Sequence, residues 1–472
     1  DPHEIANVLG IPGIRYLMDN ARGLPLNFMF AASSCVPSSP LETAGAVLSA
    51  ADLAPLFDEP EVVALAEMMN FPGVFLGVPE VLEKVNLGLG RRLVDGHAPG
   101  LAGRGLDAYV AAGISSDHEC TTAAEALEKL RRGMQIYIRE GSAARNLDAL
   151  LPLVTPANAH RFCFCTDDRH PGDLRDEGHI DHVIRRAVAS GLDPLIAIAM
   201  GSTHVAQHYR QPHLGAIAPG RQADMVVLDD LRQVRVRDTW VRGVHVASNG
   251  AYIGVEKPVG TYPASGVRLP AGLDVSSFRV PVTKPGAPIR VIGMSPTQLV
   301  TQRVELQGTV DEGAYVADVK HDVLKMVVIE RHNGTGNIGR GFVQGFKLKS
   351  GALASTVGHD SHNLAIVGTN DEDMLAAAKA LASCGGGQCV VRDGVVLALL
   401  PLPIAGLMSD QPAETVVNQQ AGLLEAARQL GCPHHDPFMP LSFMPLPVIP
   451  SLKLSDLGLV DVDAFAVVPL EV

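Results

Sequence analysis

The first 200 residues predict an α/β fold built on a parallel sheet, and a (β/α)8 barrel is its simplest form. Short apolar segments typical of strands alternate with segments typical of helices throughout this region. Polar residues stand at the end of nearly every strand-like segment, which is where barrel enzymes place their reactive groups. The chain is also 47% apolar, so it can bury a large core, and global disorder is excluded.

Six strand-like segments are short apolar runs, and each leads to a polar residue. In chain order they are 26–31 before Ser33, Ser34 and Cys35; 62–66 before Glu67; 92–96 before His97; 112–116 before His118; 134–138 before Arg139 and Glu140; and 162–166 before Asp167 and Asp168. The second of them, rich in Ala and Leu, also suits a helix. The segments predicted as helices between and after them are 41–57, 122–132, 143–153 and 194–208.

Counting these strands favours a barrel that is incomplete in this chain. A further strand is expected just before Asp1 and one more before that, which would bring the total to the eight of a barrel. We therefore expect the first strand–helix unit of the barrel to be missing from this sequence. An open, doubly wound sheet is the alternative, but it would gather its ligand at one switch point and not at the end of nearly every strand.

The predicted barrel covers residues 1–209, and the pattern changes after it. Two β-rich stretches predict a small β domain over 210–262, which would be part of a β-sandwich. Prolines punctuate residues 263–287 and predict a linker. Residues 288–472 mix β-rich and helical pieces and predict a separate C-terminal α/β domain.

Composition excludes several classes of partner. The net charge of −13, with no basic block, argues against a nucleic-acid partner. The longest apolar run, 394–408, is too short to span a membrane and contains two prolines. The seven cysteines are scattered, as expected for reduced thiols, and predict a cytoplasmic protein.

Four of the residues that follow predicted strands suggest a metal site. A barrel would bring Glu67, His97, His118 and Asp167 together at one mouth. Imidazole nitrogen and carboxylate oxygen suit Zn, Mn or Fe, and a carboxylate can bridge two ions ~3.5–4 Å apart that activate hydroxide. We therefore predict that these four residues bind divalent metal. The alternative is a separate structural role for each, such as a helix-capping aspartate or a histidine bonded to a backbone carbonyl.

Four other motifs are interpreted more plainly. Residues 334–339 fit G-x-G-x-x-G, but no helix is predicted after them, so they indicate a glycine-rich loop. Residues 359–362, His-Asp-Ser-His, indicate a polar turn, although a loop that reaches the barrel mouth is left open. Residues 432–435 hold too few ligands for a zinc site. Residues 33–35 have no evident adjacent base, so we expect them to line the substrate site and not to supply a nucleophile.

Beyond these residue types, the chain resembles the bacterial adenine deaminases of the amidohydrolase superfamily. The motifs that carry the resemblance are DPHEIANVLG, SSCVPSS, ALAEMMNFPGV, DGHAPGL, SDHECTT, YIREGSAARNL, CTDDRHPGDL, GAIAPGRQADMVVLDDL, HNGTGNIGRGFV and VGHDSHNLAIVG. They span nearly the whole chain. The resemblance implies a metal-dependent barrel, a composite β-sandwich and a C-terminal domain of the family's own. It also implies hydrolysis of adenine to hypoxanthine and ammonia, a reaction of purine salvage.

The resemblance also implies the metal ligands. In it Glu67 bridges two metal ions, His97 and His118 bind one of them, and Asp167 touches metal and accepts a proton from the attacking water. The ions would be Mn or Fe, with Zn possible. The superfamily's His-x-His pair, at the end of the first barrel strand, does not occur before Asp167. We expect this sequence to be a fragment of a longer polypeptide, because the same unit is missing from the strand count.

Three more carboxylates are expected to act on the substrate. By the resemblance, Asp168 bonds the purine ring, and Glu119 and Glu4 contact the substrate or deliver protons. Adenine and water would be the partners, and we expect a homo-oligomer, in the simplest case a dimer. A cyclic amide or imide hydrolase on the same barrel is the alternative enzyme, although it typically bridges its metals with a modified lysine where this chain has Glu67. A metal-free interaction module is the non-enzyme alternative, and it would predict disrupted ligands.

Overall fold

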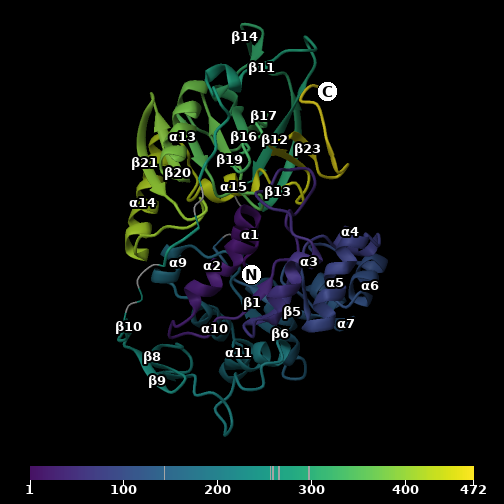
Figure 1. Ribbon diagram of the computed structural model, residues 1–472, viewed down its shortest axis with the longest axis vertical. Helices are drawn as coiled ribbons and strands as arrows, with labels where there is room; N and C mark the ends of the chain where they lie inside the picture. Colours follow the sequence, from purple (N-terminus) through teal and green to yellow (C-terminus); the bar gives the residue numbers. More distant parts are fainter. Residues whose placement is uncertain (143, 256, 258–259, 264–265, 296–297) are drawn as a thin grey trace. The chain divides into compact units, whose positions relative to one another are not determined.

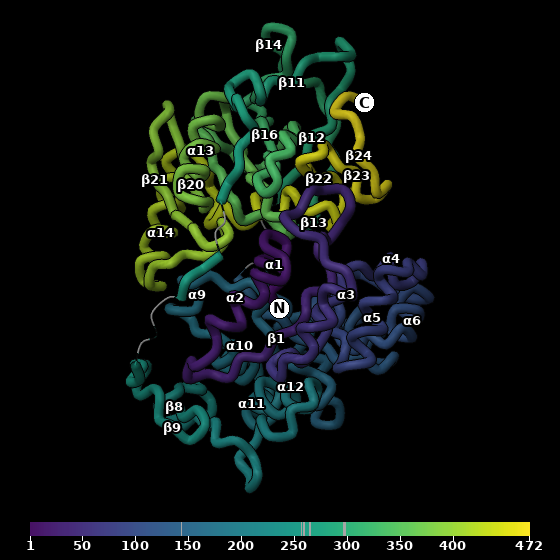
Figure 2. Tube along the Cα trace, viewed as in Figure 1, coloured from purple at the N-terminus to yellow at the C-terminus, as the bar shows by residue number. Residues whose placement is uncertain are grey.

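The computed structural model describes residues 1–142, 144–255, 257, 260–263, 266–295 and 298–472. The chain, drawn in Figures 1 and 2, forms two compact units. The first unit comprises Asp1–Pro2, Leu17–Cys35 and Leu48–Gly260, and the second comprises His3–Tyr16, Val36–Val47 and Thr261–Val472. Two short N-terminal stretches thus belong to the unit that holds the C-terminal half, which the sequence analysis did not anticipate. The domain boundaries predicted at 209, 262 and 287 stay a prediction.

Six parallel strands form the frame of the first unit, and they are neighbours in chain order. They are β1 (Phe30–Ala32), β2 (Val62–Met68), β3 (Val94–Gly96), β4 (Ser116–Asp117), β5 (Gln135–Arg139) and β6 (Phe162–Cys165). Hydrogen-bonded pairing joins β1 to β2 to β3 and β4 to β5 to β6, and a parallel bridge between Val94 and Ile114 joins the two groups. Each of the six predicted strands overlaps one of these. The closed barrel with its further unit stays a prediction.

Helices follow the strands, largely where the sequence predicts them. They are α3 (Ala50–Leu53), η1 (Ala54–Asp58), α4 (Phe71–Phe75), α5 (Pro79–Arg91), α6 (Gly103–Ala111), α7 (Ala123–Arg131), α8 (Leu147–Leu150), η2 (Leu151–Leu153), η3 (Ala159–Arg161), α9 (Pro171–Asp176), α10 (Ile180–Ala189), α11 (Pro194–Met200) and α12 (Thr203–His208). The Thr122 side chain caps α7 by accepting a hydrogen bond from the Glu125 amide, as its predicted start requires. The predicted helix 143–153 begins only at Leu147, and its first residue, Ala143, lies outside the described residues.

The helix predicted over 41–57 is wrong for its first half. Helix α3 begins only at Ala50, where Ser49 and Asp52 form a capping box. Upstream, the backbone follows an irregular path of turns and bends, held by contacts within the second unit. The Thr43 amide donates to Asp456 Oδ1 at 2.9 Å, and the Gly45 amide donates to the Asn7 carbonyl at 2.7 Å. A Cβ at Gly45 would lie 2.3 Å from the Val8 carbonyl oxygen, so only glycine fits this approach. These tertiary contacts override the helix propensity of the Ala- and Leu-rich segment.

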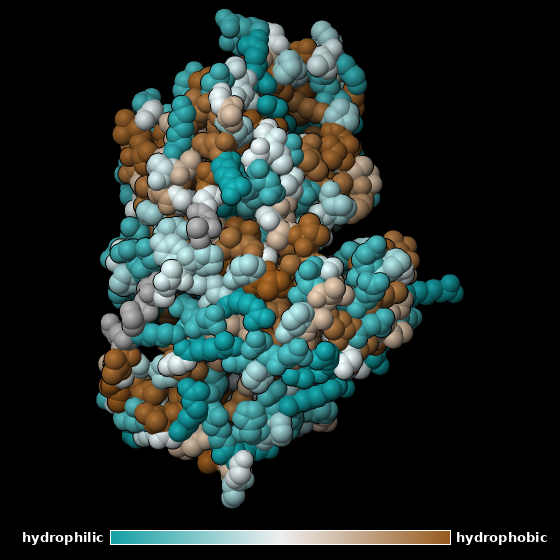
Figure 3. Space-filling view, in the orientation of Figure 1, coloured by the Kyte–Doolittle hydropathy of each residue, from teal (hydrophilic) through white to brown (hydrophobic). Residues whose placement is uncertain are grey.

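The β-rich stretch after residue 209 forms a four-stranded antiparallel sheet in the first unit. Its order is β10-β9-β8-β7, with β7 (Met225–Leu228), β8 (Val236–Val241), β9 (Val244–Ser248) and β10 (Ala251–Tyr252). Several of its apolar side chains are exposed, among them Val226 and Val244, and Figure 3 shows a hydrophobic surface over this sheet. The second layer of the predicted sandwich stays a prediction.

The second unit is centred on an eight-stranded sheet of order β13-β12-β17-β16-β19-β18-β20-β21. Its strands are β12 (Ile289–Ser295), β13 (Gln298–Leu306), β16 (Leu324–Ile329), β17 (Ile338–Gln344), β18 (Ala352–Ser355), β19 (Leu364–Gly368), β20 (Gly387–Arg392) and β21 (Val395–Pro401). Successive side chains of β16 point to opposite faces of the sheet and belong to two different hydrophobic cores. Val327 and Ile329 pack in the core that includes helix α13 (Asp371–Ser383). Met326 and Val328 pack in the core that includes helix α14 (Ala413–Gln429). The sheet is therefore covered by helices on both faces, and this mixture of strands and helices agrees with the α/β character predicted for residues 288–472.

Smaller elements complete the second unit. They are α1 (His3–Leu9), α15 (Phe438–Phe443), η4 (Val275–Phe278), η5 (Val319–His321), β11 (Val280–Pro281), β14 (Val310–Asp311), β15 (Ala314–Tyr315), β22 (Leu452–Ser455), β23 (Gly458–Asp461) and β24 (Ala466–Val467), and helix α2 (Ile11–Ala21) has residues in both units. The predicted linker thus contains a short helix and a short strand. In the part of the chain that the structure describes, no helix combines the length and apolar character needed to cross a membrane.

Candidate metal centre

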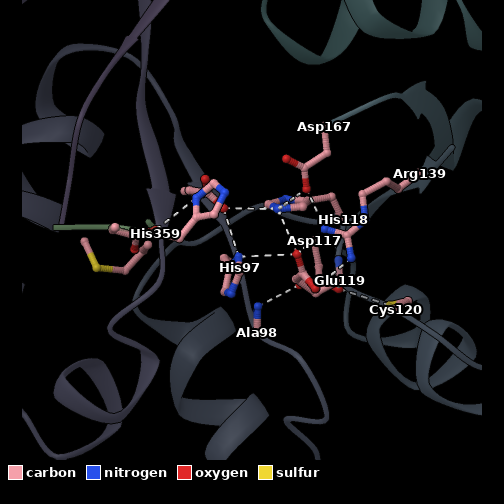
Figure 4. Close-up of polar contacts among 12 residues, drawn as sticks. His97, Ala98, Asp117, His118, Glu119, Cys120, Arg139, Asp167 and His359 are labelled. Atoms are coloured by element: carbon pink, nitrogen blue, oxygen red, sulfur yellow. Dashed lines mark hydrogen bonds and ion pairs between the residues drawn. The ribbon is translucent and has the colours of Figure 1, made fainter. Parts of the chain in front are cut away.

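The carboxyl ends of the parallel strands in the first unit carry a cluster of histidines and carboxylates. Glu67 is the penultimate residue of β2, His97 follows β3 directly, and His118 and Glu119 follow β4. Asp167 lies two residues beyond β6 and has a left-handed φ of 55°, a conformation that aspartate tolerates better than most residues. Figure 4 shows the side chains of His97, His118, Glu119 and Asp167 pointing toward one another. The strand order thus brings together residues that are up to 100 positions apart in the sequence.

Glu67 is the centre of this cluster. Its Oε2 lies 2.9 Å from His97 Nδ1 and 3.0 Å from His118 Nε2. The two imidazole rings are 5.3 Å apart between centroids, and they are tilted at 67° so that one nitrogen of each faces the same carboxylate. The ligand atoms of these three residues all lie within 4.8 Å of one another. Two imidazole nitrogens and a carboxylate oxygen at this spacing match the donor set that Zn, Mn and Fe prefer.

Two further carboxylates border His118. Its Nε2 lies 3.3 Å from Glu119 Oε1 and 3.9 Å from Asp167 Oδ2. These three residues form a second set whose ligand atoms lie within 4.8 Å of one another. Since His118 belongs to both sets, the two groups of donors are contiguous. Together the two sets supply enough ligand atoms to bind more than one metal ion.

Arg139, the last residue of β5, holds the two carboxylates together. Its Nη2 donates to Glu119 Oε2 at 2.9 Å, and its Nη1 donates to both Glu119 and Asp167. The Arg139 side chain is only 7% exposed. A buried guanidinium with a two-pronged contact fixes the orientation of its carboxylate partner. In the sequence, Arg139 stands at the end of a predicted strand, and this position is its signal for a role in the site.

The electrostatics favour the charged forms of these groups. Burial opposes ionisation of Glu67, but the imidazoles of His118 and His97 outweigh it and hold the pKa of Glu67 well below its usual value. Burial alone would lower the pKa of His118, yet Glu67 and Glu119 raise it well above its usual value. Burial likewise fails to neutralise Glu119, whose pKa is lowered by the nearby histidines and Arg139. A buried cluster in which neighbouring charges shift the pKa values of several groups is typical of functional sites.

Tyr109 and Gly96 position the ends of β2 and β3. The Tyr109 hydroxyl, fully buried on α6, donates to the Met68 carbonyl at 2.8 Å and accepts from the His97 amide at 3.0 Å. A Cβ at Gly96 would lie 2.1 Å from the Ser116 carbonyl oxygen, so glycine is required next to His97. Tyr109 carries no sequence signal for this role, because it looks like any buried residue of an amphipathic helix.

Of the remaining predicted residues of the first unit, Ser34 contacts the backbone of Glu67, and Asp168 follows Asp167 in the chain. The buried Ser34 donates its hydroxyl to the Glu67 carbonyl at 2.5 Å, and its neighbours Ser33 and Cys35 are buried as well. Asp168 is exposed, and its carbonyl accepts a hydrogen bond from the Ser142 amide. Ser34 therefore positions the strand that carries Glu67. It stays a prediction that the substrate is contacted by Ser33, Ser34, Cys35 and Asp168.

Glu4 belongs to the second unit, where it contacts two histidines. Glu4 Oε1 lies 3.1 Å from His359 Nδ1, and Glu4 Oε2 is ion-paired with His362 Nε2. These histidines lie in the loop between β18 and β19, in the motif predicted as a polar turn. The glycine-rich motif 334–339 leads into strand β17, which agrees with a loop and not with a nucleotide-binding helix start.

Comparison with known proteins identifies the family. The model of the amidohydrolase family matches residues 1–246, and that of the adenine deaminase C-terminal domain matches residues 298–466. A protein of Desulfatibacillum aliphaticivorans named adenine deaminase is 48% identical over 471 residues, which cover 100% of this chain and 82% of that protein. The chain belongs to the adenine deaminase family. The adenine deaminase of Methanothrix thermoacetophila is 47% identical over 475 residues, again covering 100% of this chain and 82% of that protein.

A solved structure outside this family is more distant. N-acetyl-D-glucosamine-6-phosphate deacetylase from Mycobacterium smegmatis aligns over 50% of this chain and 71% of its own chain, with 16% identity and a TM-score of 0.37. The adenine deaminase family assignment therefore rests on the sequence matches. Within the family, the amidohydrolase match covers all of the first unit's candidate metal ligands, and membership implies a divalent metal centre. The donor set of Glu67, His97 and His118 fits such a centre.

Proposed function

We propose that this protein hydrolyses adenine to hypoxanthine and ammonia at the cluster of Glu67, His97, His118, Glu119 and Asp167. The observation that carries the proposal is the meeting of one carboxylate oxygen of Glu67 with two imidazole nitrogens, in a chain of the adenine deaminase family. Glu67 would bridge two ions, and His97 and His118 would bind one of them. Mn or Fe are the ions we favour, with Zn as the next choice.

The reaction needs a strong nucleophile and two proton transfers. A bound divalent ion supplies the first by lowering the pKa of water toward ~7. Attack on the ring carbon that bears the amino group gives a tetrahedral intermediate, a ring nitrogen gains a proton, and the amine leaves as ammonia. Asp167 takes the proton from the attacking water, and Glu119 or Asp167 returns protons to the ring and the leaving amine. Arg139 keeps both carboxylates aimed at the same space.

Substrate recognition needs no cationic pocket, because adenine is neutral. Asp168 is proposed to accept a hydrogen bond from the purine ring, and Ser33, Ser34 and Cys35 to line the site. The role predicted for Glu4, substrate contact or proton delivery, stays a prediction, since its contacts within its own unit are with His359 and His362. We further propose a cytoplasmic homo-oligomer, in keeping with seven cysteines that are all free thiols.

Substrate screening tests the proposal against its alternatives. A polypeptide that includes residues 1–472 is depleted of metal, reloaded with Mn or Fe, and offered adenine, other purines, pyrimidines and cyclic imides while ammonia release and ring opening are followed. We expect metal-dependent conversion of adenine to hypoxanthine. Turnover of a cyclic amide or imide in preference to adenine would favour the other amidohydrolase activity. Absence of any turnover, with no metal retained, would favour the interaction module.

A further inference from the structure

A second cluster of histidines and carboxylates lies within the second unit. Helix α1 contributes Glu4, and the loop between β18 and β19 contributes His359, Asp360 and His362. Glu4 Oε1 is 3.1 Å from His359 Nδ1, which is 3.7 Å from Asp360 Oδ1. The ligand atoms of Glu4, His359 and Asp360 all lie within 4.8 Å of one another.

This cluster repeats the composition of the candidate metal centre in the first unit. In each, one glutamate carboxylate lies between two imidazoles, and an aspartate stands beside them. The ring centroids of His359 and His362 are 5.9 Å apart, compared with 5.3 Å for His97 and His118. A carboxylate shared by two imidazoles, with a further carboxylate within reach, is a donor set for a divalent transition metal in either place.

The two histidines of the loop have different roles. His362 is 1% exposed, and its Nδ1 accepts a hydrogen bond from the Gly358 amide at 3.1 Å, so its proton is on Nε2, which faces Glu4 Oε2. His362 therefore orients Glu4 and leaves Oε1 directed at His359. The ring of His359 is stacked on Phe443, 4.4 Å between centroids and 14° between planes, which restricts its rotation. Partners of this kind typically hold the ligands of a metal in place.

The environment of Asp360 is not explained by an ion pair between Glu4 and His359. The residue is 6% exposed, and its Oδ2 has no hydrogen-bond partner among the described residues. A buried carboxylate oxygen without a partner is costly, and a bound cation would remove that cost. The ion pair of Glu4 with His359 leaves Asp360 Oδ2 without a hydrogen-bond partner.

We propose that Glu4, His359 and Asp360 form a second binding site for a divalent transition-metal ion, of the Mn, Fe or Zn class, separate in ligands from the Glu67 centre. The site offers one imidazole nitrogen and two carboxylates, which leaves coordination positions for water. This second site is independent of the deamination proposed for the first unit, because the experiment that tests it measures bound metal and not activity.

Metal counting in a background without the first centre tests this site. A polypeptide that includes residues 1–472 carries His97→Ala and His118→Ala, is depleted of metal, and is incubated with MnCl2 or, separately, ZnCl2. After gel filtration, bound metal per chain is counted by mass spectrometry. We expect about one ion per chain in this background, and its loss when Asp360→Asn or His359→Ala is added.

His321→Ala serves as the matched control, because His321 Nδ1 lies 2.8 Å from Asp318 Oδ2 in an exposed histidine–aspartate pair of the same unit. This control should keep the ion. Absence of bound metal in the double-alanine background, or an ion that survives both Asp360→Asn and His359→Ala, would overturn the proposal. Asp360→Asn nearly preserves side-chain shape, so it decides the matter if His359→Ala fails to fold. An anomalous-diffraction peak in contact with Glu4, His359 and Asp360 would be the direct positive result.

Discussion

Lys129 and Asp117 form an ion pair with both side chains fully buried, and their Nζ and Oδ2 atoms are 3.1 Å apart. Lys129 Nζ also donates to the Ala98 carbonyl at 2.6 Å, while Asp117 Oδ1 accepts from the Ala98 amide at 2.8 Å. Ala98 and Asp117 are the chain neighbours of His97 and His118, so this pair ties together the two loops that carry the histidines. The pair therefore braces the candidate metal centre without belonging to it.

Lys129→Met should destabilise the protein strongly, because it leaves the Asp117 carboxylate buried without its cation. Removing one partner of a buried pair costs about 3–5 kcal/mol. Urea unfolding measures this loss, and metal retention during dialysis should weaken in parallel. The control is Arg132→Met, whose pair with Asp107 lies at the surface, where solvent screening leaves an ion pair with little effect on stability. Equal stability of the two variants would show that the buried pair has no bracing role.

Glu67→Gln should lower the amount of metal bound at the first centre. An amide is a neutral and weak ligand, and it cannot replace a carboxylate that bridges two ions. Metal analysis of purified protein should show a loss of at least one ion per chain relative to the unsubstituted protein. Glu80→Gln, on the exposed side of α5, makes the same chemical change and should leave metal content unchanged. Unchanged occupancy in Glu67→Gln would count against bridging.

Arg139→Met should slow deamination by roughly 10²-fold or more, in the range found when one preorganised electrostatic partner is removed. Glu119 and Asp167 would lose the cation that aligns them. We expect the loss mainly in kcat, and partial recovery in Arg139→Lys, which keeps the charge but not the two-pronged contact. Steady-state kinetics with adenine measure both variants, with metal content checked in parallel. A kcat for Arg139→Met equal to that of the unsubstituted enzyme would refute this role.

Lys453 should give the stability a pH dependence above neutral pH. Burial lowers its pKa from the ordinary 10.5 to about 7. Between these values the unfolded chain binds one more proton than the folded chain, so the free energy of unfolding rises with pH by roughly 1.4 kcal/mol per pH unit. Below about pH 7 both states are protonated, and this contribution to the slope vanishes. Urea unfolding at several pH values should show the slope, and Lys453→Met should remove that part of it.

Much of the first unit's fold could be predicted from local sequence. Short apolar runs ending in polar residues predicted all six parallel strands, because buried parallel strands have few alternatives to such runs. The path of residues 36–47 could not be predicted this way. Its conformation depends on Asp456 and Asn7, which lie far from it in the sequence.

The candidate site shows the same division. Glu67, His97, His118 and Asp167 could be predicted because each stands at a strand end and has a side chain suited to metal. Tyr109 and Lys129 could not, since both lie on helices, and their roles come from contacts with backbone groups that no pattern reveals. Contact between Glu4 and the loop at His359 likewise depends on tertiary packing and leaves no local signal.

The central claim is that Glu67, His97 and His118 form a metal centre that deaminates adenine. Its most direct test is the rate of hypoxanthine formation from adenine by metal-depleted protein, measured against added Mn, for the unsubstituted polypeptide and for His118→Ala. We expect metal to restore activity to the unsubstituted polypeptide, whereas His118→Ala should stay folded by circular dichroism and inactive at every metal concentration. Activity of His118→Ala at the unsubstituted rate, or full activity without metal, would show that these residues do not form the catalytic metal centre.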